Sequence, residues 1–224
     1  MKKVLFVLMT VVGMLFSQAV ADDGYWPKSY FVQVGYGAVA TRGDLRSSIL
    51  SIKDTAGIKG KSYHPDIEIM GTPDFAIGAN IAQFTLALDF QYTTTSSGLA
   101  GMPEDYGNED SRIWRLGFEF TYNIFWPEDF QIGLGGGYSY TSVKTDNSTF
   151  FDGSSYSAEL MGSAVGVVAN LHYYLTDHFA IAPSIKIYEN WFKNIYTSRT
   201  ENCDLDPYLW HTFVMAAVSL QYQF

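Results

Sequence analysis

The sequence ends in VMAAVSLQYQF, residues 214–224, in which apolar and aromatic side chains recur at every second position. Val218, Leu220, Tyr222 and Phe224 share one face of this segment, whereas Ser219 and the glutamines share the other. Alternation with period two is typical of a β-strand whose two faces meet different environments. Chain ends usually fray unless they are held by other elements. A chain that stops on such a strand therefore predicts that its last strand is paired.

Seven further segments alternate in the same way, and almost nothing in the chain has the period of a helix. In each of them large apolar or aromatic residues occupy one face, and Gly, Ser, Gln, Asn or a few charged residues occupy the other. The segments are 29–40, about 66–81, 83–93, 113–125, 130–141, 161–173 and 179–188.

A soluble β-sandwich would also alternate, but its water-facing side would carry many Lys and Glu residues. Here the small or polar face has little charge and the other face is rich in aromatics, which favours apolar side chains facing lipid and polar ones facing a lumen. Strands cross a bilayer in roughly 9–11 residues. By that count Trp114, Trp191 and Trp210 fall near the outer rim and Trp126 near the inner one, where amphipathic aromatics settle.

The connections alternate between short and long, as in outer-membrane barrels. Short turns are expected around Ala82, at 126–129 and at 175–178, and long polar loops at 41–65, 94–110, 144–155 and 193–207. An even number of strands lets the first strand pair with the last, so that no edge stays open. We predict an all-β fold, an eight-stranded antiparallel transmembrane β-barrel of the outer-membrane type.

The N-terminus resembles an export signal. Lys2 and Lys3 precede an apolar run, and Ala19-Val20-Ala21 forms a small-residue cleavage site, so residues 1–21 are expected to be a signal peptide and 22–224 the barrel. The formal charge of −9 and the scattered cations argue against nucleic-acid binding. Cys203 is the sole cysteine, so it cannot form an internal disulfide.

Over essentially its whole mature length the chain resembles the small bacterial outer-membrane barrels, the OmpA, OmpX and OmpW-like group. The likeness is one of architecture rather than of a sequence motif. In that group a terminal Phe with Tyr two places earlier resembles the signal read by the barrel-assembly machinery, and Tyr222 and Phe224 match it. The resemblance implies a location in the cell outer membrane, contact with outer-membrane lipids including lipopolysaccharide, and a monomer.

Charged residues at similar heights are expected to face the lumen and to pair there, because isolated charges are strongly penalised in so narrow a space. The favoured interpretation is a structural plug, since an eight-stranded barrel is only just wide enough for its own side chains. The alternative is a gate whose rearrangement opens a narrow ion path. The residues of this predicted charge network are Asp74, Asp89, Arg115, Glu119 and Lys186.

Two prolines lie within predicted strands, at Pro73 and Pro183, and each removes a backbone donor from the sheet. They indicate either a bulge or a weakened lateral seam of the kind implied for OmpW-like conduits of small hydrophobic compounds. The run Gly133, Gly135, Gly136 and Gly137 indicates room for bulky neighbours rather than a phosphate-binding loop, because no Lys-Ser/Thr and no helix follow it.

Catalysis has weak support. His64 and the pair Asp110 and Ser111 suit a lipid A-modifying acyl transferase or hydrolase in type, but such residues coincide easily by chance. The four histidines are dispersed, so we expect no metal site, and no cofactor. The sequence therefore predicts a non-enzymatic barrel with a structural, surface-interaction or small passive-channel role. The hydrophobic-compound conduit and the lipid A-modifying enzyme are the alternatives.

Overall fold

A computed structural model describes residues 29–44, 49–53, 59–63, 70–97, 109–125, 130–149, 155–197 and 203–224. The predicted signal peptide, the turn at 126–129, Trp126 and His64 lie outside these residues. No helix among the described residues is long and apolar enough to cross a membrane.

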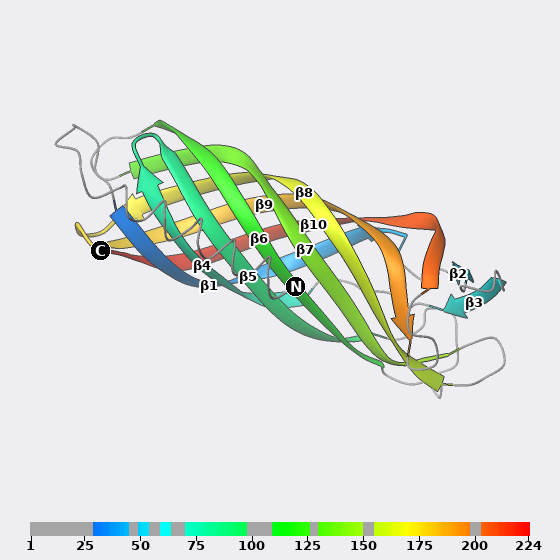
Figure 1. Cartoon of the computed structure of the whole chain (residues 1–224). Helices are drawn as coiled ribbons and strands as arrows, with labels where there is room; N and C mark the ends of the chain where they lie inside the picture. The colour runs from blue at the N-terminus through cyan, green and yellow to red at the C-terminus, as the bar shows by residue number, and fades with distance from the viewer. Residues whose placement is uncertain are drawn as a thin grey trace.

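Eight strands form a closed antiparallel barrel, which confirms the predicted fold class (Figure 1). Each strand pairs with the next one round the barrel, and β1 pairs with β10 from Phe31↔Gln223 to Gly43↔His211, so the sheet closes on itself. The barrel strands are β1 (Ser29–Gly43), β4 (Met70–Ile81), β5 (Phe84–Ser97), β6 (Glu109–Phe125), β7 (Phe130–Thr149), β8 (Ser155–Tyr174), β9 (Phe179–Thr197) and β10 (Cys203–Gln223).

The barrel has two unlike ends, which we call inner and outer. The C-terminus and two described short turns, Ala82–Gln83 and Leu175–His178, lie at the inner end (Figure 1). Ala82 takes a left-handed φ of 52° in its two-residue turn, and Phe224 N–H donates to the Tyr30 carbonyl at 2.8 Å. The first and last strands are therefore joined right up to the final residue.

The outer connections differ from the prediction. The segment 41–65 contains a hairpin, β2 (Ile49–Lys53) and β3 (Lys59–Tyr63), and β2 pairs with β10 at Lys53↔Asp204 and Ile52↔Leu205. Most of the predicted loops 144–155 and 193–207 continue the strands, since β7 runs to Thr149 and β10 begins at Cys203. Strands of up to 21 residues exceed the roughly 9–11 needed to cross a bilayer, so the barrel extends beyond the membrane at its outer end.

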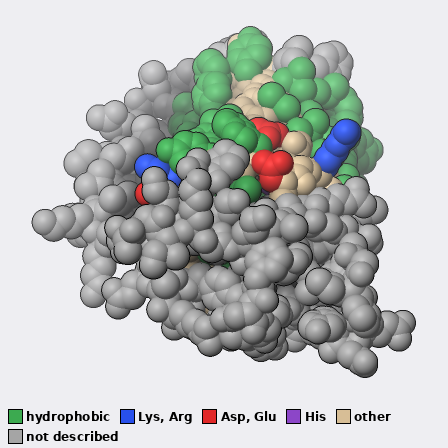
Figure 2. Space-filling model, turned by 90° about the vertical axis from the view of Figure 1, so that its right-hand side faces the viewer, with side chains coloured by type: hydrophobic (Ala, Val, Ile, Leu, Met, Phe, Trp, Pro, Cys, Tyr) green, Lys and Arg blue, Asp and Glu red, His purple; other side chains and the backbone are tan. Residues whose placement is uncertain are grey.

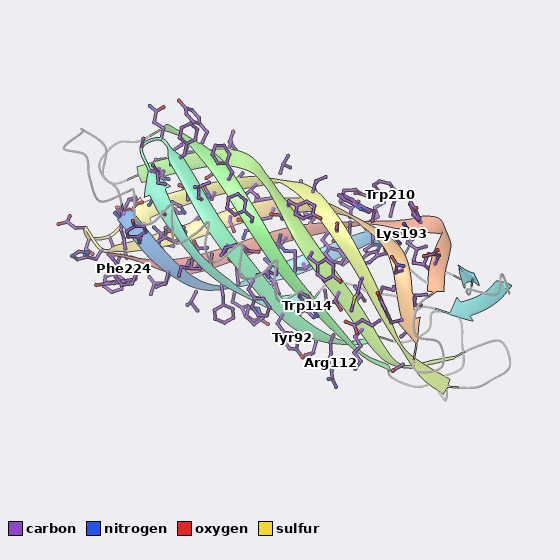
Figure 3. All side chains as sticks on the ribbon, in the orientation of Figure 1. Tyr92, Arg112, Trp114, Lys193, Trp210 and Phe224 are labelled. Atoms are coloured by element: carbon purple, nitrogen blue, oxygen red, sulfur yellow. The ribbon has the colours of Figure 1, made fainter. Side chains whose placement is uncertain are left out.

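The exterior carries the apolar belt that the sequence predicted. Val34, Tyr138 and Val218 are each more than half exposed, and each of the eight strands has exposed large apolar side chains. Trp114 and Trp210 point away from the barrel wall in its outer half, where Arg112 and Lys193 also project (Figure 3). Exposed apolar side chains over the whole circumference are what contact with lipid requires.

The interior is polar only in part, which corrects the simple rule of apolar outside and polar inside. In the outer half the lumen is filled by an apolar cluster, which we call the outer core. Seen from the outer end, hydrophobic side chains predominate among those described, with acidic side chains between them (Figure 2). The outer core consists of Val39, Ile113, Val143, Ala158, Leu160, Phe192, Ile195, Leu205, Leu209, Phe213, Met215 and Ala217.

Candidate lumen charge cluster

The structure brings the five predicted lumen charges together at mid-height, between the outer core and a polar layer at the inner end. We call this set the charge cluster. Each member alternates with a lipid-facing neighbour, so strand parity alone turns it inward. Its residues come from four strands: Asp74 on β4, Asp89 on β5, Arg115 and Glu119 on β6, and Lys186 on β9.

Lys186 links the three carboxylates. Its ammonium lies 2.5 Å from Asp89 Oδ2, 3.1 Å from Glu119 Oε1 and 3.4 Å from Asp74 Oδ1. Arg115 is ion-paired with Asp89 through Nη2 and lies 3.4 Å from Glu119 Oε1. None of the five residues is more than 6 % exposed, so the charges are compensated by one another rather than by bulk water.

Neutral side chains complete the cluster, and the sequence interpretation had not singled them out. Gln91 donates to Asp74 at 3.0 Å and accepts from Arg115 Nε at 3.0 Å. Ser219 donates to Asp74 at 3.2 Å. Tyr188 donates to Glu119 at 2.9 Å, and its ring lies 4.1 Å below the Arg115 guanidinium carbon. Inward parity was a usable signal for Tyr188, but the sequence does not reveal which strand it faces.

Gly137 makes room for that tyrosine. A Cβ at Gly137 would lie 2.3 Å from the Tyr188 hydroxyl, so a side chain there would displace the hydroxyl from Glu119. The glycine run thus provides space for a bulky neighbour at this position, as the sequence indicated.

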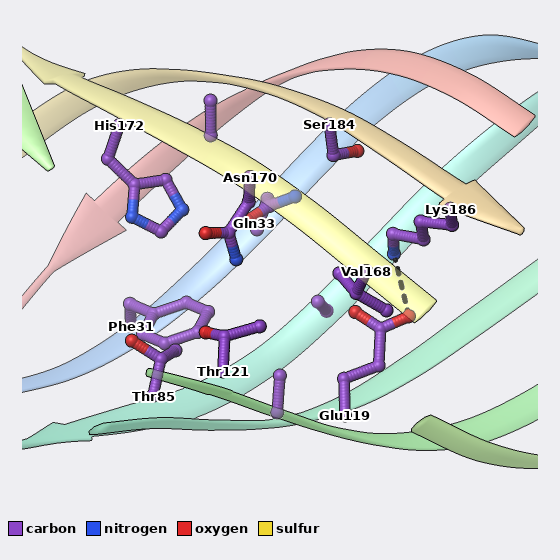
Figure 4. Close-up of a pocket in the computed structure, with 13 residues that line it drawn as sticks. Phe31, Gln33, Thr85, Glu119, Thr121, Val168, Asn170, His172, Ser184 and Lys186 are labelled. Carbon is purple, nitrogen blue, oxygen red and sulfur yellow. Dashed lines mark ion pairs between the residues drawn. The ribbon is translucent and has the colours of Figure 1, made fainter. Parts of the chain in front are cut away.

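A polar layer lies below the cluster, at the inner end. Asn80 donates to Ser29 at 3.1 Å, and Thr85 donates to Asn80 at 2.7 Å. Asn123 and Gln131 both donate to Thr85, at 3.1 and 3.3 Å. A small cavity of about 20 Å³ joins this layer to Glu119 and Lys186 (Figure 4). This space holds one or two waters and is far smaller than a solute.

At both prolines singled out in the sequence, the backbone pairing between neighbouring strands ends or is interrupted. The β4–β5 pairing ends at Asp74↔Gln91, next to Pro73, and beyond it the Thr93 hydroxyl donates to the Gly71 carbonyl. The β8–β9 pairing is interrupted between Asn170↔Ser184 and Tyr173↔Ile181, opposite Pro183, without a change of register. Pro183 still pairs with Val218 of β10. The geometry at Pro183 is thus a local gap rather than a bulge.

The remaining candidates are scattered. Tyr222 packs on Phe179 and Phe224, with ring centroids 5.0 and 5.1 Å apart, and Phe224 is 66 % exposed. His172 lies in the inner polar layer and His211 in the outer lumen, far apart along the barrel. Among the described residues no three His, Cys, Asp or Glu side chains gather as metal ligands. The side chains of Asp110, Ser111 and Cys203 lie outside the described ones.

Comparison with known proteins identifies the fold. No protein-family model matches the sequence, and no curated protein matches it significantly. Solved structures do match. Neisserial surface protein A is 13 % identical with a TM-score of 0.52, covering 88 % of this chain and 99 % of its own. A major outer membrane protein from Thermus thermophilus is 10 % identical (TM-score 0.53; 88 % and 99 % covered), and the outer membrane protein OprG from Pseudomonas aeruginosa is 14 % identical (0.51; 90 % and 98 %). The chain therefore has the fold of the eight-stranded outer-membrane β-barrels.

Proposed function

We propose that the protein is a closed, non-catalytic barrel of the outer membrane that supports the envelope and carries its outer extension at the cell surface. The observation that supports this proposal is the filled lumen. The charge cluster blocks the barrel at mid-height and the outer core blocks it above, while the cavity between cluster and inner layer is only about 20 Å³. An ion would have to break several buried ion pairs to pass, each of which is expensive to separate.

Planar-bilayer recording tests the closed state. The purified chain should show no conductance steps under conditions in which an open porin, the positive control, conducts. The same recording distinguishes plug from gate. If the wild-type protein conducts and Arg115→Ala changes its single-channel behaviour, the charge cluster is a gate and the closed-barrel proposal fails.

A second function, a conduit for small hydrophobic compounds, is favoured by one combination of features. The outer core offers an apolar interior above the charge cluster, and the β4–β5 ladder ends beside it at Pro73. A hydrophobic solute entering from outside could leave sideways into the bilayer at that position. Uptake of an apolar fluorescent solute by cells with and without the protein tests this path. Equal uptake would exclude it.

Catalysis on lipid A is not part of the proposal. Its test is the acyl pattern of lipid A extracted from cells with and without the protein, which we expect to be unchanged.

We further propose that lipopolysaccharide surrounds the apolar belt, that the barrel is a monomer, and that the barrel-assembly machinery reads Tyr222 and Phe224. Native mass spectrometry of the detergent-extracted protein would report both its oligomeric state and retained lipid.

A further inference from the structure

Three side-chain oxygens converge on one point of the inner polar layer. Asn123, Gly133 and Asn170 lie side by side on β6, β7 and β8, because Asn123 pairs with Gly133 and Gly133 pairs with Asn170. A Cβ at Gly133 would lie 2.2 Å from Asn170 Oδ1, 3.0 Å from Asn123 Oδ1 and 3.1 Å from Thr121 Oγ1. Only glycine therefore fits at this position, because the three oxygens closely approach the place that a side chain would take.

None of these three oxygens has a hydrogen-bond partner among the described residues. Thr121 and Asn123 are 2 % and 3 % exposed, so bulk water does not solvate them either. Buried polar atoms are nearly always paired, with protein groups, water or an ion. The Thr121 hydroxyl carries one hydrogen, which can satisfy only one of the two amide oxygens. The other amide oxygen still calls for a ligand that carries positive charge or donates hydrogen bonds.

The hydrogen-bond network fixes the orientation of Asn123. The Thr85 hydroxyl donates its only hydrogen to Asn80 Oδ1 at 2.7 Å, so Thr85 can only accept from Asn123 Nδ2, which lies 3.1 Å away. The Asn123 amide nitrogen is therefore used in this bond, and its carbonyl oxygen faces Gly133.

The neighbouring charge cluster supplies the electrostatic reason for a cation. Its three carboxyl groups face two cationic side chains, so the cluster carries one excess negative charge when all three are ionised. Glu119 and Thr121 are two residues apart on the same face of β6, about 7 Å along the strand. One cavity is lined by Glu119, Thr121 and Asn170 together, and their side chains point into it (Figure 4).

We propose that the oxygens of Thr121, Asn123 and Asn170 over Gly133 form a binding site for a small hard monovalent cation such as Na⁺ or K⁺. Oxygen ligands suit hard cations, and the one excess negative charge matches a single positive one. Thr121 and Asn170 also line the small cavity of about 20 Å³ described above, which has room for a water that completes the coordination of the ion. The bound cation completes the charge balance of the lumen from its inner side.

The test measures ion-specific stabilisation of the full chain refolded in detergent. Urea midpoints are compared in NaCl, KCl and N-methyl-D-glucamine chloride at matched ionic strength. A site on the folded state raises the midpoint in a saturable way with the small cation. The bulky organic cation cannot enter the cavity and should give no such rise. Equal midpoints in the three salts would overturn the proposal.

Variants localise the effect. Thr121→Val removes one oxygen with little change of shape and should raise the half-saturating Na⁺ or K⁺ concentration about tenfold, whereas Asn170→Asp should lower it about tenfold. Gly133→Ala places a methyl group among the oxygens and should abolish the effect if the variant folds. The matched control is Thr141→Val, an inward threonine on β7 in the outer half, which bonds to Asn190 at 2.8 Å.

Two results would contradict this site. One is an unchanged ion dependence in Asn170→Asp, which would mean that the Asn170 amide is satisfied in another way. The other is an equal loss of ion dependence in Thr121→Val and Thr141→Val, which would place the cation elsewhere. Neither result depends on the conductance of the barrel, so this inference and the closed-barrel proposal fail separately.

Discussion

Lys186 lies at the centre of the lumen, with its ammonium within 3.4 Å of carboxylates from β4, β5 and β6. A buried ion pair contributes little net stability when compared with an apolar pair, because both charges lose their hydration. Removing one partner is different, since it leaves the other charge buried and unpaired. Lys186 therefore compensates the negative charge of three buried carboxylates at once.

Lys186→Met should therefore destabilise the barrel by about 3–5 kcal/mol, the cost of leaving buried carboxylates without their cation. Lys193→Met is the matched control, because Lys193 lies on the same strand but is exposed, and its ammonium lies 5.9 Å from the centroid of the Tyr208 ring. Urea unfolding in lipid vesicles measures the unfolding free energy of both variants. Similar losses for the two variants would contradict a structural role of the charge cluster.

Elements of the sheet differ in how well they are joined. Most neighbouring strands pair over a dozen or more residues, but β4 and β5 pair only from Asp74↔Gln91 to Ile81↔Phe84. Above that level Pro73 offers no backbone N–H, and the Thr93 hydroxyl bridges to the Gly71 carbonyl instead. The Thr93 side chain thus replaces a backbone hydrogen bond that is missing between β4 and β5 above Asp74.

Thr93→Val should loosen the outer end of β4. We expect faster hydrogen exchange at the amides of 70–72, with unchanged exchange at 74–81, because only the bridge to Gly71 is lost. Thr94→Val, which changes the exposed outward neighbour, is the control. Hydrogen exchange of both variants in detergent micelles, measured by mass spectrometry, tests this expectation. Unaltered exchange in Thr93→Val would show that the bridge does not hold the two strands.

A substitution of Phe224 distinguishes a role in barrel assembly from a role in the stability of the folded barrel. Its backbone N–H donates to the Tyr30 carbonyl, but the residue is 66 % exposed. Phe224→Ala should leave the urea midpoint of refolded protein nearly unchanged, within about 0.5 kcal/mol in unfolding free energy. If the assembly machinery reads this residue, the amount of folded protein in outer membranes should fall. Phe84→Ala, another outward aromatic at the inner end, controls for lost lipid contact. Undiminished assembly of Phe224→Ala would reject the signal.

The whole molecule changes its polarity along its axis. In the half next to the inner end, apolar side chains face lipid and polar side chains fill the lumen. In the outer half an apolar core lies in the lumen beside buried polar residues such as Thr141 and Asn190, while Arg112 and Lys193 are exposed on the outside. The outer half therefore combines an apolar core in its lumen with an exterior on which charged and aromatic side chains are both exposed. Such an extension is stabilised by its own core and does not depend on lipid.

Phe192→Ala should consequently destabilise the protein by about 3–5 kcal/mol, because it leaves a cavity in the outer core. Phe192 is fully buried, whereas Ile187 of the same strand is 40 % exposed on the lipid face. Ile187→Ala should have a smaller effect in vesicles, since lipid can fill the space. The unfolding free energies of both variants provide the comparison. A larger loss for Ile187→Ala would contradict the presence of a packed core in the outer half.

The extension was missed in the sequence for a physical reason. Period-two patterns depend on an unbroken register, and β-bulges shift the inward parity by one residue. The β8–β9 register shifts near Lys193, so that Phe192 and Ile195 both face inward although they are an odd number of residues apart. A further shift in β10 lies between Asp204 and Leu209. Strict period-two alternation stops at these points, so the segment 193–207 resembles a loop in the sequence.

The sequence by itself determined the number of strands, their closure into a barrel and the face on which each charge of the lumen lies, because strand parity is a local property. Only the tertiary structure decided which of those charges meet, that Tyr188 and Gln91 join them, and that three oxygens face one another over Gly133. Such contacts depend on the stagger between strands far apart in the chain and on the bulges in the outer half. No local pattern encodes them.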